Sequence, residues 1–168
     1  MRKIDLKQEL SMYNLEGKWN DCIGVQKEVL RVLRDEEFFD SNEIINFETG
    51  LRVKLNVKGI KETLGTGKRF QALPKRLKER KIATVRHIRS IIESAEIIAD
   101  NVGNVHITNG DMFTYMRGMV RIDDEEVVVR IAVRKKVATN WFWIHHIDEN
   151  KKSPKLLDPS GKTELKEI

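Results

Sequence analysis

The first forty residues show the hydrophobic period of a helix. Asn20 is of a residue type that caps helices, and apolar side chains then recur three and four positions apart, on one stripe. These apolar positions are Cys22, Val25, Val29, Val32 and Leu33. The acidic run 35–37 suits a position beyond a helix C-terminus, because the helix dipole disfavours negative charge there. We therefore expect a helix that starts near residue 20 and ends before the acidic run.

The period changes to two after Glu43, which indicates a β-hairpin. Residues 43–47 form a short apolar run, and Thr49 and Gly50 follow as a turn signal. Apolar and polar side chains then alternate from residue 51 to residue 58, as in a strand with one buried face.

A helical period returns between residues 59 and 99. Residues 59–64 predict a short helix, and Thr84 is a suitable N-cap for a longer one. Apolar side chains then share one face of the expected helix, and they are Val85, Ile88, Ile91, Ile92, Ala95, Ile98 and Ala99. We expect residues 101–104 to end this helix.

Strands are expected in the C-terminal half. Alternating residues predict strands over residues 114–122 and 127–134, on either side of an acidic turn. If Ile122 pairs with Val127, the apolar side chains gather on one face of the pair. The opposite face then carries Tyr115, Arg117, Arg121, Arg130 and Arg134. Residues 141–147 predict a last strand, and the whole pattern is that of a mixed α and β protein.

Length and composition narrow the class of protein. The 168 residues suit a helical appendage at residues 1–42, a main domain at residues 43–150 and a polar tail at residues 151–168. The single cysteine, Cys22, excludes an internal disulfide. No apolar run reaches the length of a membrane span, and the N-terminus lacks the apolar stretch of a signal peptide. We therefore expect a soluble protein of the cytoplasm with no membrane partner.

Positive charge is concentrated in one segment. The net charge is +5 at pH 7, but residues 52–89 contain 13 lysines and arginines and only two acids, Glu62 and Glu79. That segment carries +11, and the rest of the chain carries −6. A segment of this kind attracts polyphosphate by Coulomb force and counterion release. The charge predicts RNA or another nucleic acid as partner, and the alternative is a solvated helix surface.

The segment Gly65-Thr66-Gly67-Lys68-Arg69 matches a phosphate-binding loop only in part. A Walker A loop needs a glycine at the position of Glu62, and a serine or threonine at the position of Arg69. The pattern therefore argues against a nucleoside triphosphatase. Two interpretations stay open, namely a loop whose Lys68 and Arg69 contact an RNA backbone, and a flexible connector.

His145 and His146 are suited to proton transfer. Adjacent strand residues point to opposite faces, so these imidazoles are poorly placed to bind one metal ion, and we expect neither metal nor cofactor. Metal-free RNA cleavage needs a base for the 2′-hydroxyl, an acid for the 5′-oxygen and fixed positive charge on the phosphorane. Histidine suits the proton transfers and arginine suits the charge. The alternative is a histidine beside arginines on an ordinary surface.

Short motifs resemble the phage-associated branch of the nuclease superfamily that includes barnase, EndoU, certain colicins and RelE. They are the stretch 49–63 and the runs 113–118 and 143–148, and the resemblance covers about residues 43–150. It implies an α+β fold, with N-terminal helices packed on an antiparallel sheet of four to five strands. Members are typically metal-independent ribonucleases of phages, mobile elements and toxins, with the active site on the open sheet face.

The resemblance also implies roles for single residues. His145 or His146 corresponds to the histidine of the closing strand and would act as the acid. Glu62 stands where the phage branch often has a histidine, and a glutamate can serve as the base. Arg130, on the preceding strand, would hold the phosphate together with Lys58. The remaining substrate contacts would be Arg117, Arg134, Tyr115, Lys68 and Arg69.

The sequence therefore predicts a metal-independent endoribonuclease that cleaves RNA by attack of the 2′-hydroxyl, leaving a 2′,3′-cyclic phosphate. A toxin of this kind would need an immunity partner in the producing cell. Two non-enzymatic alternatives remain. One is a module that only binds nucleic acid, and the other is a phage accessory protein that docks on a partner through residues 1–42.

Overall fold

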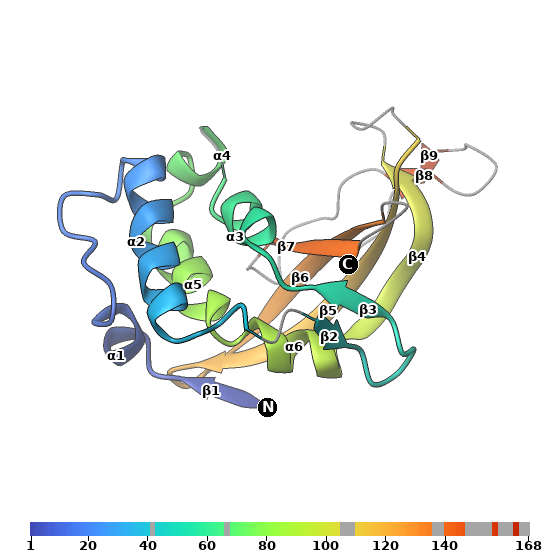
Figure 1. The fold of residues 1–168 in the computed structure, drawn as a ribbon, viewed down its shortest axis with the longest axis horizontal. Helices are drawn as coiled ribbons and strands as arrows, with labels where there is room; N and C mark the ends of the chain where they lie inside the picture. Colours follow the sequence, from blue (N-terminus) through green and yellow to red (C-terminus); the bar gives the residue numbers. More distant parts are fainter. Residues whose placement is uncertain are drawn as a thin grey trace.

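The computed structural model describes residues 1–40, 43–65, 68–104, 110–135, 140–146, 156–157 and 163–164. Within these ranges the chain forms six helices and nine strands. The helices lie together on one side of the molecule, and a twisted sheet forms the other side (Figure 1). This arrangement is α+β and confirms the predicted fold class. For Lys68, Asn104 and the strands from residue 140 onward, only the backbone is described.

The helices precede the long strands along the chain. They are α1 (Leu6–Leu10), α2 (Cys22–Asp35), α3 (Val57–Thr63), α4 (Lys68–Gln71), α5 (Lys75–Val85) and α6 (Ile88–Ser94). The helix expected near residue 20 is α2, and its cap is Asp21 rather than Asn20, because the Asp21 side chain accepts a hydrogen bond from the Gly24 N–H. The short helix expected at residues 59–64 is α3, and the Asn56 side chain caps it in the same way.

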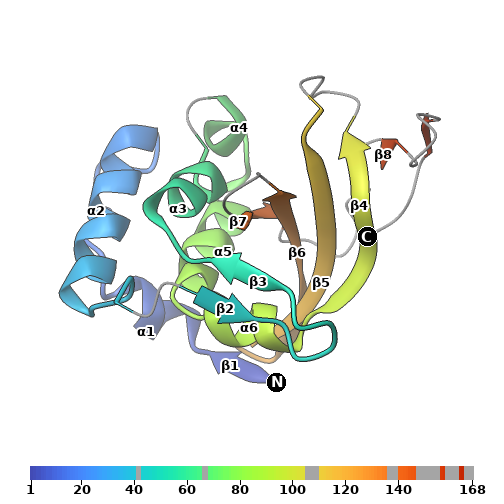
Figure 2. The ribbon, with the colours of Figure 1, turned by 45° about the vertical axis from the view of Figure 1, so that its right-hand side comes forward.

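The strands build one mixed sheet around an antiparallel centre. They are β1 (Arg2–Ile4), β2 (Glu43–Ile45), β3 (Arg52–Lys54), β4 (Glu96–Asn104), β5 (Met112–Ile122), β6 (Glu125–Lys135), β7 (Asn140–His146), β8 (Leu156–Leu157) and β9 (Thr163–Glu164). Strands β4 to β7 are antiparallel neighbours in chain order (Figure 2). The expected hairpin is β2–β3, and β3 extends the centre by pairing parallel with β7.

The helix expected from Thr84 to residue 99 is wrong in its second half. Two helices, α5 and α6, cover its first part, and the backbone of Ala95 turns to an extended conformation. Residues 96–104 then form β4, which pairs with β5. Pairing with a neighbouring strand overrides the local helical spacing, which carries no information about that neighbour.

The β5–β6 hairpin has the predicted faces but not the predicted register. Ile122 pairs with Glu125 and Val120 pairs with Val127, so the strands are shifted by two residues. The shift follows from a two-residue turn, in which Asp123 has a positive φ of 53°. Because side chains alternate with a period of two, a shift of two positions leaves every side chain on its expected face.

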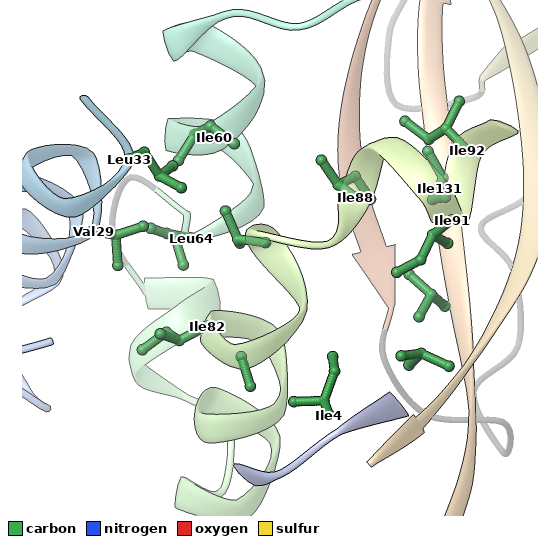
Figure 3. Packing of buried hydrophobic residues seen from close by; sticks show 14 of the residues in the cluster. Ile4, Val29, Leu33, Ile60, Leu64, Ile82, Ile88, Ile91, Ile92 and Ile131 are labelled. Carbon is green, nitrogen blue, oxygen red and sulfur yellow. The ribbon is translucent and has the colours of Figure 1, made fainter. Parts of the chain in front are cut away.

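One hydrophobic core joins the helices to one face of the sheet (Figure 3). Val29 and Leu33 from α2 belong to it, as does Ile131 from β6. The approach of α6 to β5 is so close that a Cβ atom on Gly118 would lie 2.4 Å from Ile91 Cγ2.

The N-terminal forty residues take part in this packing. Ile4 and Val25 are buried in the same core, and β1 pairs parallel with the end of β5. The Asp123 N–H also donates to the Ile4 carbonyl oxygen, at 2.8 Å. Whether residues 1–42 are an appendage that the main domain folds without stays a prediction, as does the tail at residues 151–168, most of which lies outside the described residues.

Candidate functional site

The backbone register aligns three candidate residues across three neighbouring strands. Arg117 on β5 pairs with Arg130 on β6, and Arg130 pairs with His146 on β7. Along β5 the alternating neighbours Met116 and Val120 face the helices, so Arg117 and Arg130 lie on the opposite face of the sheet. The sheet therefore brings together a row of positions that sequence reasoning had placed on separate strands.

The two candidate histidines are placed only by their backbones. The register of β6 with β7 shifts between Ile131, which pairs with Ile144, and Arg130, which pairs with His146. His145 is therefore the additional residue of an irregularity in β7. The side chains of His145 and His146 lie outside the described residues, so their assignment as acids stays a prediction.

Carboxylates accompany the arginines of this face. Arg117 forms an ion pair with Glu96 at 2.9 Å, and both side chains are about half exposed. Arg134 pairs with Asp111, and both of these side chains are mostly buried. The face is therefore a network of opposite charges, and an RNA phosphate would have to displace a carboxylate to bind Arg117. An exposed ion pair contributes only about 0–1 kcal/mol to stability, so replacing Glu96 by a phosphate at Arg117 would cost little free energy.

Two further candidates on the same face are buried. Arg130 is 6% exposed and Tyr115 is 1% exposed. The Tyr115 ring stacks on Phe113, with ring centroids 6.1 Å apart, and the Arg134 guanidinium lies over Phe113. Tyr115 is therefore packed in the interior, and its ring has no face accessible to a ligand. Its role as a substrate contact stays a prediction.

Helix α3 carries the other two catalytic candidates next to β7. Lys58 and Glu62 are exposed and four residues apart, so they lie on the same side of the helix. The opposite side of α3 is buried, through Ile60 and Thr63. The helix packs against β7 (Figures 1 and 2). The structure thus places Lys58 and Glu62 on the helix that borders the histidine-bearing strand.

Lys81 on α5 is a site candidate that sequence reasoning missed. Its Nζ atom donates to the Thr63 carbonyl oxygen at 3.1 Å. Burial and, to a smaller extent, the nearby Arg69 lower the pKa of Lys81 from 10.5 to about 8, and Glu62 acts in the opposite direction. A lysine whose pKa lies near neutral pH can exchange protons, and such groups are frequent at functional sites. Glu62, Arg69 and Lys81 thus form one electrostatic cluster, whereas the side chain of Lys68 lies outside the described residues.

Folding neutralises part of the positive segment at residues 52–89. Several of its arginines pair with acids from other parts of the chain, and these pairs are Arg52–Glu43, Arg76–Glu125, Arg80–Glu125, Arg86–Glu9 and Arg86–Glu36. Lys78 is buried and donates to the Trp19 carbonyl oxygen. The segment charge of +11 therefore overstates the positive charge that this part of the folded surface presents.

A second polar cluster is buried where the N-terminus meets the α5–α6 junction. The Arg2 Nε–H donates to His87 Nδ1 at 2.9 Å, so Nδ1 is the acceptor and Nε2 carries the proton that bonds to Glu9, at 2.8 Å. Arg86 makes two further hydrogen bonds to the Glu9 carboxylate. Burial raises the pKa of Glu9, but the hydrogen bonds from His87 and Arg86 outweigh burial and lower it to about 2. These hydrogen bonds hold β1 and α1 against the junction of α5 and α6.

Two general properties complete the description of the site. In the described part of the chain, no three side chains of the types His, Cys, Asp and Glu are grouped so that they could hold a metal ion. Within the same ranges, none of the helices has the length and apolar character that crossing a lipid bilayer requires.

Comparison with known families gives the context of this geometry. The model of the family described as large polyvalent protein-associated domain 3 matches residues 25–142. The chain belongs to this family. The match begins in α2 and ends in β7, so the family unit includes both the α2–α3 pair and the row Arg117–Arg130. No curated protein and no solved structure matches the chain significantly.

Proposed function

We propose that this member of the large polyvalent protein-associated domain 3 family is a metal-independent endoribonuclease. The observation that carries the proposal is the register that aligns Arg117, Arg130 and His146 across β5, β6 and β7. Arginines and a histidine at paired positions of neighbouring strands are the residue types that RNA cleavage without a metal needs. Helix α3, which carries Lys58 and Glu62, contacts β7 from the helix-covered face of the sheet, opposite to Arg117 and Arg130, so the proposal assigns them roles at the border of β7.

In the proposed reaction, Glu62 or a histidine removes the proton of the 2′-hydroxyl. The 2′-oxygen attacks the adjacent phosphorus, and the bond from phosphorus to the 5′-oxygen breaks. His145 or His146 gives a proton to the leaving 5′-oxygen, so the products are a 2′,3′-cyclic phosphate and a free 5′-hydroxyl. Arg130 and Lys58 stabilise the charge on the phosphorane. If the enzyme acts as a toxin, the cell that makes it would need an immunity protein as partner.

The decisive experiment is incubation of the purified protein with cellular RNA in the presence of EDTA. His145→Ala and His146→Ala variants are compared with His106→Ala, which changes a histidine that has no role in the proposal. We expect cleavage that survives EDTA, leaves cyclic phosphate ends, and disappears in one of the first two variants only. A folded protein that leaves all RNA intact, or equal cleavage by all three variants, would contradict the proposal.

A non-catalytic RNA-binding domain is the second candidate. The burial of Arg130 favours it, because a guanidinium that is only 6% exposed is poorly placed to stabilise a phosphorane, whereas the half-exposed Arg117 can still contact a phosphate. This candidate predicts binding that weakens with salt and no turnover. Variants at His145 and His146 would then bind RNA as the unaltered protein does.

A further inference from the structure

We propose that a cleft between α2 and α3 binds the sugar-phosphate backbone of single-stranded RNA. The cleft has a volume of about 460 Å³. It is lined by Ile23, Gln26, Lys27, Leu30, Arg31, Arg34, Asp35 and Lys61. The choice of RNA as ligand rests on the proposed function, whereas the cleft and its charge are independent of it.

The charge of the cleft is strongly one-sided. Lys27 and Arg34 on α2 are exposed, and so is Lys61 on α3. In the part of the chain that the structure describes, no carboxylate forms an ion pair with any of these three side chains. Arg31 is compensated, because it pairs with Glu28 at 2.7 Å and with Asp35, the acid at the edge, at 3.3 Å. The surplus of positive charge in the cleft therefore comes from Lys27, Arg34 and Lys61.

The cations on α2 form a row along the helix. Lys27, Arg31 and Arg34 are four and three residues apart, so they share one side of α2. With a rise of about 1.5 Å per residue, the row extends about 10 Å. Lys61 faces it from α3. A row of regularly spaced cations with one further cation on the opposite wall suits a chain of phosphates better than a single anion.

The walls of the cleft are held at a fixed separation. Gln26 is buried on α2, and its amide donates to the Lys61 carbonyl oxygen at 3.3 Å and to the Gly65 carbonyl oxygen. The Cys22 thiol also bonds to the Gly65 carbonyl oxygen, at 2.8 Å. These contacts join α2 to the C-terminal end of α3. The two helices that carry the cations are therefore held together before any ligand binds, which lowers the cost of forming the cleft on binding.

The lining favours a polyanion over an acidic protein segment. Protein interfaces have an apolar centre with a polar rim. Here Leu30 is only 4% exposed, and Ile23 at 64% is the lining residue that presents a large apolar surface. One exposed isoleucine beside four cationic side chains is a weak apolar centre.

The cleft also lies next to the proposed catalytic residues. Lys61 is on the same exposed side of α3 as Lys58 and Glu62. An RNA strand that leaves the cleft past Lys61 would therefore meet the two catalytic candidates of α3, and then β7. The cleft would act as the part of the substrate site that precedes the bond to be cut.

Binding is tested by fluorescence anisotropy with a labelled 2′-O-methyl oligouridylate of about 12 nucleotides, over a range of salt concentrations. This probe has no free 2′-hydroxyl, so the proposed reaction cannot cleave it. The test variant is Lys27→Gln with Arg34→Gln. The control, Lys7→Gln with Arg76→Gln, also removes one lysine and one arginine from exposed helix positions, so the net charge of the two proteins is equal.

We expect the cleft variant to bind about tenfold more weakly near physiological salt, with a smaller salt dependence by about 1.4 for two lost phosphate contacts. The control variant and the unaltered protein should bind alike. Equal weakening of both variants, absence of binding by the unaltered protein, or binding of an acidic peptide in place of the oligonucleotide would overturn the proposal. If the cleft variant cleaves RNA at an unchanged rate, the cleft proposal fails and the ribonuclease proposal stands. If the unaltered protein binds the probe through the cleft but cleaves no RNA, the ribonuclease proposal fails and the cleft proposal stands.

Discussion

At the residue scale, burial and nearby charges shift the pKa values of ionisable side chains. Glu9 and Lys81 illustrate two opposite cases. Glu9 is a buried acid that is compensated by His87 and Arg86, so its charged form is stabilised by folding. Lys81 is a half-buried base whose charged form is destabilised, because desolvation and Arg69 outweigh the attraction of Glu62. Both shifts link protein stability to pH, with different windows.

The Glu9→Gln variant should be less stable than the unaltered protein at pH 7. The folded pKa of Glu9, about 2, lies below its ordinary value of 4.5, so its contribution is complete above that value and disappears as pH falls towards 2. The loss at pH 7 should be at most about 3 kcal/mol. Urea unfolding at pH 7 and at pH 3 measures it. The exposed Glu16→Gln is the matched control, and a difference that stays constant between these pH values would contradict the assigned pKa.

The Lys81→Met variant tests the opposite sign. Between pH 8 and pH 10.5 the unfolded chain binds a proton at Lys81 that the folded protein has released, so stability rises with pH in this window. The unaltered protein should gain up to about 3 kcal/mol relative to the variant across this range. Unfolding experiments at pH 7.5 and pH 10 measure the gain, with Lys7→Met as control. Parallel stability curves for Lys81→Met and the unaltered protein would show that Lys81 has an ordinary pKa.

At the element scale, the arrangement depends on a close approach of α6 to the centre of the sheet. Gly118 lies where β5 passes beneath Ile91, and that position leaves no space for a Cβ atom. The contact fixes α6 against the same stretch of β5 that carries Arg117 on its other face. The position of the candidate site therefore depends on a glycine that has no chemical role.

The Gly118→Ala variant should lower the free energy of unfolding by about 1–3 kcal/mol, because the added methyl group overlaps Ile91 Cγ2. Combining it with Ile91→Ala removes the overlapping atom. In a double-mutant cycle measured by thermal unfolding, the combined loss should be smaller than the sum of the separate losses. Strict additivity would mean that the two positions do not press against each other.

Some elements could be predicted from sequence, and others could not. Helix α2 and the faces of β5 and β6 follow from local periodicity, which needs no partner. Strand β4 could not be found this way, because Ile91, Ile92 and Ala95 continue into a spacing that also suits a helix, and the register shifts of β4 against β5 break its alternation. The candidate site also divides into a part that could be predicted and a part that could not. The alternation of side chains along the hairpin predicts that Arg117 and Arg130 share a face. The Glu9–His87 bond joins residues 78 positions apart, and no local pattern could reveal it.

At the scale of the whole molecule, charge and core are both shared between distant parts of the chain. Several arginines of the positive segment at residues 52–89 form ion pairs with acids outside it. The cleft between α2 and α3 keeps a surplus of positive charge. The helix α2 that forms one wall of this cleft also buries Val25 and Val29 in the core. The first forty residues therefore contribute to both stability and the proposed RNA contact.

Removal of residues 1–42 should prevent cooperative folding of the remainder. The deletion takes away β1 and α2, so apolar side chains of α3 and α5, such as Ile60 and Ile82, would become exposed. Circular dichroism during heating would show a broad transition, or none, for residues 43–168 and a sharp one for the full chain. A sharp transition for the fragment would instead establish residues 1–42 as a separate appendage.

The parallel pairing of β1 with β5 has a consequence for synthesis. The hydrogen bond from the Leu6 N–H to Asp123 Oδ1, which closes this corner, joins residues 117 positions apart. Strand β1 therefore leaves the ribosome well before β5 and has no partner until β5 has been translated. Contacts between residues so distant in sequence form slowly and leave a strand edge open in the meantime. Strand β1 is thus made long before it can pair with β5, and during that interval a chaperone would find it accessible.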